Sequence, residues 1–333
     1  MKKALIIGID AYEHAPRLSG CVNDAVAMRT VLEQQANGDP NFDVRMLNSD
    51  DMKVTSEAMV GALQGLFSGD CETALLYFAG HGTIDKLSET GHLVSQDGKK
   101  GSLGLSLVDI LSAANRVHPR VKSSVIILDS CTSGALGEVP AVGNTSSPTS
   151  HIGTGVTILT ACTREQSAGE VKGHGIFTGL LLDGLRGTAA DIRGHISPAS
   201  LYSLIDQTLG PWEQRPVYKA NVDSFVTLRQ VAPKIPLDVL RRLPEYFPSA
   251  SHIYPLDPSY EPDRTALNPD QLSNYPENKS HQLIFKELQA CNRHGLIVPV
   301  EAEHMFFAAM NSTGCRLTAV GAHYRTLAVA RRI

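Results

Sequence analysis

Apolar runs and amphipathic stretches alternate along the first 230 residues of the chain. Several runs are apolar at almost every position, which is typical of strands buried on both faces of a parallel sheet. The alternation predicts an α/β domain with a mostly parallel central sheet. The predicted strands are Lys3–Ile9, Asp43–Leu47, Thr73–Ala79, Ser124–Leu128, Thr157–Thr160 and, with a less regular pattern, Phe225–Leu228. The predicted helices are Cys21–Gln35, Ser56–Phe67, Leu105–Ala114, Ile176–Leu185 and Pro198–Leu209.

Other parts of the chain lack this alternation. Asp85–Leu105 and Gly134–Gly155 are rich in Gly, Ser, Thr and Asn, which predicts two long loops. Nine of the 18 prolines lie between Pro233 and Pro276, which predicts a proline-rich linker over residues 231–276. Residues 277–333 then predict a small α+β domain. Its expected elements are a helix at His281–Arg293, a strand or turn at Gly295–Val300, a helix at Ala302–Met310 and a strand and helix within Arg316–Ala328.

Length and composition are those of an ordinary globular protein. The 333 residues allow one large domain or two, with 42% hydrophobic and 19% charged residues. Residues 1–230 hold 19 Lys and Arg against 24 Asp and Glu, so we expect no nucleic-acid partner for this half. The apolar stretch Ala4–Ile9 is too short for a signal peptide or a membrane span. We therefore expect a cytoplasmic protein without a membrane partner.

The six cysteines are spread along the chain without any paired CxxC spacing. This distribution predicts free thiols and argues against a disulfide framework or a zinc ribbon. The sequence also shows no ligand spacing for another metal site, so the expected metal content is none.

Two of the apolar runs end in residues that can carry chemistry. ALLYFAG leads into His81 and Gly82, and SVIILDS leads into Cys131. The carboxyl ends of parallel strands meet at one edge of a sheet, so the two side chains are expected to face one another there. A histidine in that position activates a cysteine nucleophile, and neighbouring glycines leave room for main-chain N–H groups that bind an oxyanion. We expect those donors to be the N–H groups of Gly82 and Cys131.

The order of motifs IIGIDAY, GCVNDAVAM, YFAGHG, IILDSCTSG and GHGIFTGLLLDGLRG resembles the caspase-like cysteine peptidases, in particular their prokaryotic metacaspase-like branch. The histidine precedes the cysteine by 131 − 81 = 50 residues, as in caspases. The resemblance covers residues 1–230 and implies a caspase-hemoglobinase α/β/α sandwich. It further implies a large-subunit-like part at 1–135, an inter-subunit loop at 136–155 and a small-subunit-like part at 156–230.

The resemblance also implies a specificity. In metacaspase-like enzymes, acidic residues at the positions matching Asp24 and Asp129 line the pocket for the residue before the scissile bond. Two carboxylates in a narrow pocket select Lys or Arg, so the expected activity is an endopeptidase that cleaves after basic residues. Thr132 stands where many relatives have histidine, which leaves the Cys–His dyad intact. No cofactor is required, although some relatives are activated by calcium.

For several other Cys, His and basic residues, a structural role explains their presence more simply than a functional one. Cys21 and Cys162 are expected to be buried apolar side chains, and His174 is expected to lie in a turn before a helix. Basic residues in or near the predicted loops are candidate autocleavage positions, with solvated surface charge as the alternative. These residues are Lys99, Lys100, Arg164 and Lys172.

The carboxy-terminal stretch RLTAVGAHYRTL, together with the helices before it, resembles the end of a winged-helix domain. The expected recognition helix Ala302–Met310 contains no Lys or Arg, which favours a regulatory or partner-binding role over DNA binding. Relatives of this kind act in prokaryotic stress responses or antiphage defence and are usually monomeric. Two alternatives remain open, a catalytically silent caspase-like scaffold and a DNA-associated regulator acting through residues 277–333.

Overall fold

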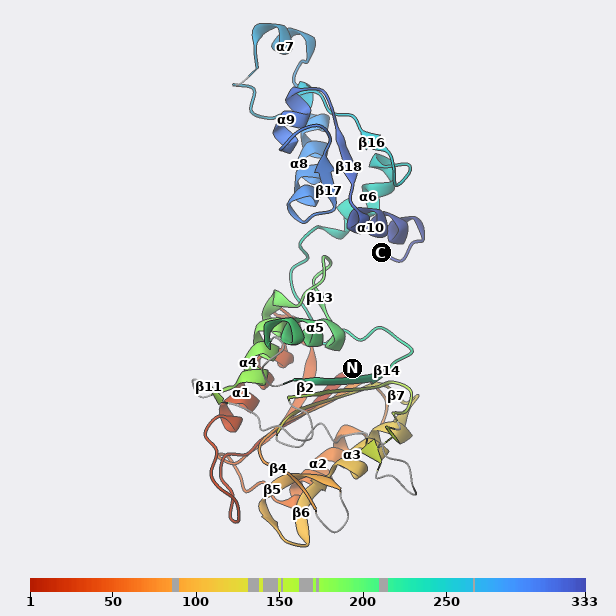
Figure 1. Cartoon of the computed structure of the whole chain (residues 1–333). Coiled ribbons are helices and arrows are strands. Elements are labelled where there is room, and N and C mark those ends of the chain that lie inside the picture. Colours follow the sequence, from red (N-terminus) through yellow and green to blue (C-terminus); the bar gives the residue numbers. More distant parts are fainter. Residues whose placement is uncertain are drawn as a thin grey trace. The chain divides into compact units, whose positions relative to one another are not determined.

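The computed structural model forms two compact units, residues Met1–Ala232 and Pro233–Ile333, which are described separately (Figure 1). The structure describes residues 1–85, 90–130, 138–139, 149–150, 152–161, 170–171, 174–209, 215–265 and 267–333. Side chains are described for all of these except residues 138–139, 149–150, 170–171 and 174.

A six-stranded sheet forms the centre of the first unit, in the order β14-β10-β7-β3-β1-β2. All neighbouring pairs are parallel except β10 with β14, so the predicted mostly parallel α/β sheet is confirmed. The central strands are almost entirely buried, because helices cover both faces. The strands are β1 (Lys2–Gly8), β2 (Phe42–Asn48), β3 (Cys71–Ala79), β7 (Val121–Asp129), β10 (Val156–Thr160) and β14 (Val217–Asn221).

Among the described residues of this unit, five helices lie on the two faces of the sheet, close to their predicted positions (Figure 1). One face packs against α1, α4 and α5, whose apolar residues share a core with Tyr77 and Ile127. The other face packs against α2 and α3, which share a second core with Phe78 and Ile126. Thr55 and Ser106 cap the N-termini of α2 and α3. The bounds are α1 (Cys21–Glu33), α2 (Ser56–Leu66), α3 (Leu107–Val117), α4 (Ile176–Asp183), followed by a π-helical turn at Gly184–Thr188, and α5 (Pro198–Leu209).

The prediction of a loop at Asp85–Leu105 is wrong. Apart from residues 86–89, which lie outside the described part, this stretch belongs to an antiparallel meander of β4 (Gly82–Ile84), β5 (Gly91–Lys99) and β6 (Ser102–Ser106). Leu93 and Leu105 are buried in the core of α2 and α3. The polar and glycine content of the strands and a register irregularity between Val94 and Lys99 hide the two-residue period.

The prediction of a strand at Phe225–Leu228 is also wrong. The antiparallel edge strand is β14, whose residues are only half-buried or exposed and so lack an apolar run. The remaining strands that the structure describes in the first unit have two residues each. They are β8 (Glu138–Val139), β9 (Thr149–Ser150), β11 (Glu170–Val171), β12 (His174–Gly175), β13 (His195–Ile196) and β15 (Arg229–Gln230). Most of the loop predicted at Gly134–Gly155 lies outside the described residues.

The second unit has a three-stranded antiparallel sheet in the order β16-β18-β17. Helix α9 lies between β17 and β18 in the chain, and the resemblance to a winged-helix domain stays a prediction. The elements are α6 (Leu237–Tyr246), β16 (Ile253–Tyr254), a 3₁₀ turn at Pro258–Tyr260, α7 (Pro269–Asn274), α8 (Lys279–Arg293), β17 (Ile297–Pro299), α9 (Met305–Met310), β18 (Cys315–Leu317) and α10 (Ala319–Val329).

The segment predicted as a linker over residues 231–276 includes helix α6. Val239, Leu240 and Leu243 are buried, and the spacing between them is that of one helix face. Pro244 and the surrounding prolines conceal this period in the sequence. The segment is therefore largely part of the second unit. No helix among the described residues is both long and apolar enough to cross a membrane.

Candidate active site

The backbone brings the two predicted catalytic segments together at the carboxyl edge of the sheet. Ala79 of β3 pairs with Asp129 of β7, and the N–H of Gly80 donates a hydrogen bond to the Asp129 carbonyl at 3.3 Å. His81 and Ser130 follow directly on these neighbouring strands. Cys131, the predicted nucleophile, is next in the chain and lies outside the described residues.

Groups from the loop after β1 hold His81 in place. The His81 backbone N–H donates to the Tyr12 hydroxyl at 2.8 Å, and the two rings are in contact with centroids 4.7 Å apart. The His81 ring atom Nε2 lies 2.8 Å from the carbonyl oxygen of Pro16. Because a carbonyl can only accept, Nε2 is the protonated nitrogen and Nδ1 carries the lone pair in the neutral ring.

Gly80 is required by the close approach of Tyr12. A Cβ atom at Gly80 would lie 2.4 Å from the Tyr12 hydroxyl and 2.9 Å from the Phe78 ring. Burial raises the pKa of Tyr12 well above its ordinary value, so its hydroxyl stays protonated at all physiological pH values. Tyr12 and Pro16 were not predicted as site residues.

Asp24 lies in the first turn of α1, and its side chain is only 2% exposed. Its Oδ2 accepts a hydrogen bond from the N–H of Gly175 at 3.0 Å, across 151 residues of sequence. Buried Asp10 fixes the start of α1, because its carboxylate accepts hydrogen bonds from the N–H groups of Cys21 and Val22. Asp10 thus positions the helix that carries Asp24.

Asp129 is the last residue of β7 and is 7% exposed. Its Oδ2 accepts a hydrogen bond from the Thr178 hydroxyl of α4 at 2.6 Å. The Thr178 hydroxyl is in turn 2.6 Å from the hydroxyl of Tyr77, which is fully buried. Burial and the nearby charges of Asp129 and Asp24 raise the pKa of Tyr77 well above its ordinary value.

Gly175, at the start of α4, lies between the two predicted pocket carboxylates. A Cβ atom built there would be 2.4 Å from Oδ2 of Asp129 and 3.3 Å from Oδ2 of Asp24. The structure therefore brings Asp24 and Asp129 together around one glycine, at the positive N-terminal end of α4. Gly175 and Thr178 are further site residues that were not predicted.

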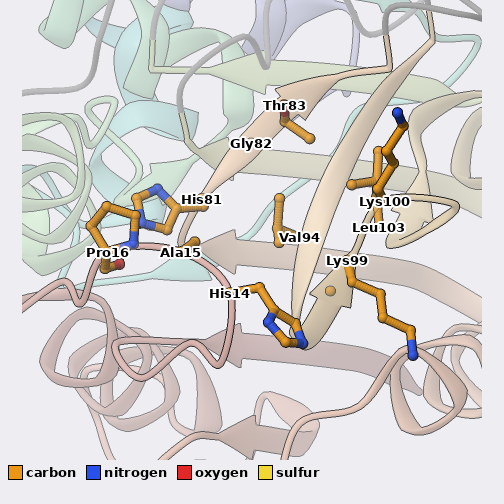
Figure 2. A pocket seen from close by; sticks show the side chains of 11 residues that line it. His14, Ala15, Pro16, His81, Gly82, Thr83, Val94, Lys99, Lys100 and Leu103 are labelled. Atoms are coloured by element: carbon orange, nitrogen blue, oxygen red, sulfur yellow. Dashed lines mark hydrogen bonds between the residues drawn. The ribbon is translucent and has the colours of Figure 1, made fainter.

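A cavity of about 520 Å³ lies beside His81, on the side of the β4–β6 meander (Figure 2). Gly82, the predicted oxyanion donor, lines it directly after His81. Lys99 and Lys100 line the opposite side, at the end of the β5–β6 hairpin. Figure 2 shows His81 and Pro16 on one side of the cavity and the two lysines on the other.

The structure describes some of the other residues that were named from the sequence, and the rest lie outside its described part. Cys21 is buried, as expected for an apolar side chain. His174 was expected in a turn before a helix, but its backbone forms part of the two-residue strand β12, immediately before α4. Cys162, Arg164 and Lys172 lie outside the described residues. Within the described part of the chain, no group of three or more His, Cys, Asp or Glu side chains could hold a metal ion.

Comparisons with known proteins agree with this architecture. A sequence profile of the caspase domain matches residues 1–223. Protein GSU0716 of Geobacter sulfurreducens has a similar fold, with a TM-score of 0.50 and 17% identity over 70% of this chain and 98% of its own. Caspase-1 of Spodoptera frugiperda is similar with a TM-score of 0.50 and 13% identity, over 69% of this chain and 90% of its own. No curated protein sequence matches the chain.

Proposed function

The chain belongs to the caspase-domain family, and we propose that it is a cysteine endopeptidase that cleaves peptide bonds after Arg or Lys. The nucleophile in this proposal is Cys131, with His81 as its base. Asp24 and Asp129 bind the basic side chain of the substrate. A protein or peptide is the substrate, and the reaction requires no cofactor.

The observation that carries the proposal is the convergence of Asp24 and Asp129 on Gly175 next to the strand end that leads to Cys131. Two buried carboxylates that lie close together favour a cation between them. Removing a carboxylate from water costs free energy unless an opposite charge lies next to it. An acidic substrate side chain would be repelled by both. This arrangement therefore favours a basic residue before the scissile bond over an aspartate.

The position of His81 supports its role as the base. The Pro16 carbonyl keeps the proton on Nε2, which leaves Nδ1 to take the proton of the Cys131 thiol. The thiolate attacks the scissile carbonyl carbon, and a tetrahedral oxyanion forms, for which Gly82 and Cys131 are the proposed N–H donors. When the C–N bond breaks, His81 gives its new proton to the leaving amine. Water then hydrolyses the thioester and regenerates the thiol.

The test compares fluorogenic peptides that differ only in the residue before the scissile bond. Wild type is expected to cleave after Arg and Lys, and Asp24→Asn or Asp129→Asn should lower kcat/KM for these peptides at least about tenfold. Asp109→Asn removes an exposed carboxylate from the first turn of α3 and serves as the matched control. Cleavage after Asp would refute the assigned pocket, and equal cleavage of all peptides by all variants would refute the role of both carboxylates.

A further inference from the structure

The charged side chains that line the cavity beside His81 are two lysines. Its described lining residues include Lys99 and Lys100 and contain no Asp or Glu. The two lysines are exposed, and among the described side chains neither has a carboxylate within ion-pair distance. By contrast, Lys53 nearby is paired with Glu13 at 2.5 Å. The cavity thus presents two lysine ammonium groups that no described carboxylate pairs with.

The cavity and the carboxylate pair of Asp24 and Asp129 lie on different faces of the sheet. Asp24 and Gly175 belong to α1 and the start of α4, on the face that holds the first core. The meander that carries Lys99 and Lys100 packs through Leu93 and Leu105 against the core of α2 and α3 on the other face. His81 stands at the strand end between them and lines the cavity itself.

In the proposed reaction, a different part of the substrate binds on each of these two faces. The side chain before the scissile bond enters the pocket of Asp24 and Asp129. The amine that leaves receives its proton from His81, so the residues after the scissile bond must pass the His81 side of the site. The cavity of Lys99 and Lys100 begins on that side (Figure 2).

We propose that this cavity is a subsite for an acidic residue within the first three positions after the scissile bond. Resting on the proposed function, this inference narrows the substrate class to segments in which a basic residue is followed by Asp or Glu. The substrate charges then complement the enzyme on both sides of the scissile bond, since carboxylates face the basic side chain and ammonium groups face the acidic one.

The test uses internally quenched peptides with Arg before the scissile bond and Asp, Asn or Lys at each of the three following positions. Wild type should prefer Asp over Lys at one of these positions by about fivefold in kcat/KM, and the preference should weaken at high salt. Lys99→Glu combined with Lys100→Glu should reverse it. Lys122→Glu is the matched control, because this exposed lysine lies near the amino end of β7, away from the site.

A second readout separates this inference from the proposed activity. Binding of labelled Arg-Gly-Asp-Asp and Arg-Gly-Lys-Lys peptides to the full chain carrying Cys131→Ala is measured by fluorescence polarisation. Tighter binding of the acidic peptide that is lost in the Lys99/Lys100 variant supports the subsite, whether or not the wild type is active. Equal binding of both peptides, or none, overturns it. Cleavage after Arg without any effect of the following residues overturns the subsite and leaves the proposed function standing.

Discussion

Glycines at two positions let polar groups of the site approach one another. Gly80 admits the Tyr12 hydroxyl that binds the His81 backbone, and Gly175 admits the carboxylates of Asp24 and Asp129. At either position a Cβ atom would lie 2.4 Å from an oxygen atom, closer than real Cβ contacts. The geometry of the site therefore depends on the absence of a side chain as much as on the reactive ones.

Gly175→Ala is expected to lower kcat/KM for Arg peptides at least about tenfold, because the methyl group would occupy the space between the two carboxylates. Gly179→Ala, in the same helix α4, is the control, since a Cβ there meets no atom within 4 Å. Steady-state kinetics with an Arg peptide measure the effect, and thermal unfolding of both variants checks the fold. Unchanged kinetics in folded Gly175→Ala would contradict the assigned pocket.

Some residues of the candidate site could be predicted from the sequence, and others could not. His81 and Cys131 could be named because each follows a buried strand that ends in a reactive side chain. Asp24 and Asp129 came from the family resemblance, and the structure places both around Gly175. Tyr12 and Pro16 could not be predicted, because their contacts with His81 span 69 and 65 residues and follow no local pattern.

Strands buried on both faces were the easiest elements to predict. β1, β3 and β7 each contain a continuous apolar run and are buried at most positions, since helices cover both sides of the sheet. Two elements were missed because they carry no such signal. The edge strand β14 has half-buried or exposed residues, and the β4–β6 meander, which was expected to be a loop, mixes polar residues and glycines with its few buried apolar side chains.

Helix α6 allows a test of whether the proline-rich segment of residues 231–276 packs as part of the second unit. Leu243→Ala is expected to destabilise the second unit by about 2–5 kcal/mol, because Leu243 is fully buried. Leu237→Ala, at the 38% exposed first residue of the same helix, should cost less than about 1 kcal/mol. Hydrogen-exchange mass spectrometry measures both. Equal protection in wild type and Leu243→Ala would show that α6 contributes no packing energy to the second unit.

Every residue of the proposed site belongs to the first unit, and the caspase-domain match ends at residue 223. The first unit has its own two hydrophobic cores, on either face of its sheet. The second unit contributes none of the groups that bind substrate or transfer protons in the proposal. Its regulatory or partner-binding role stays a prediction.

A fragment of residues 1–232 is therefore expected to fold and to cleave Arg peptides with a kcat/KM at least equal to that of the full chain. A higher value would indicate that residues 233–333 restrain the enzyme. The two proteins are compared at equal concentration by steady-state kinetics, with circular dichroism as the check on folding. A folded fragment without activity, beside an active full chain, would contradict the placement of the whole site in the first unit.

Mass spectrometry of the protein after treatment with a peptidyl-arginine chloromethyl ketone tests whether Cys131 is the nucleophile of a site that binds a basic side chain. Burial raises the pKa of Cys291 and of Cys315 to about 12, so these thiols are protonated and inert at neutral pH. We expect one adduct, on Cys131, which is lost in His81→Gln and forms far more slowly with the matching aspartyl reagent. An adduct on another cysteine, or faster labelling by the aspartyl reagent, would contradict this expectation.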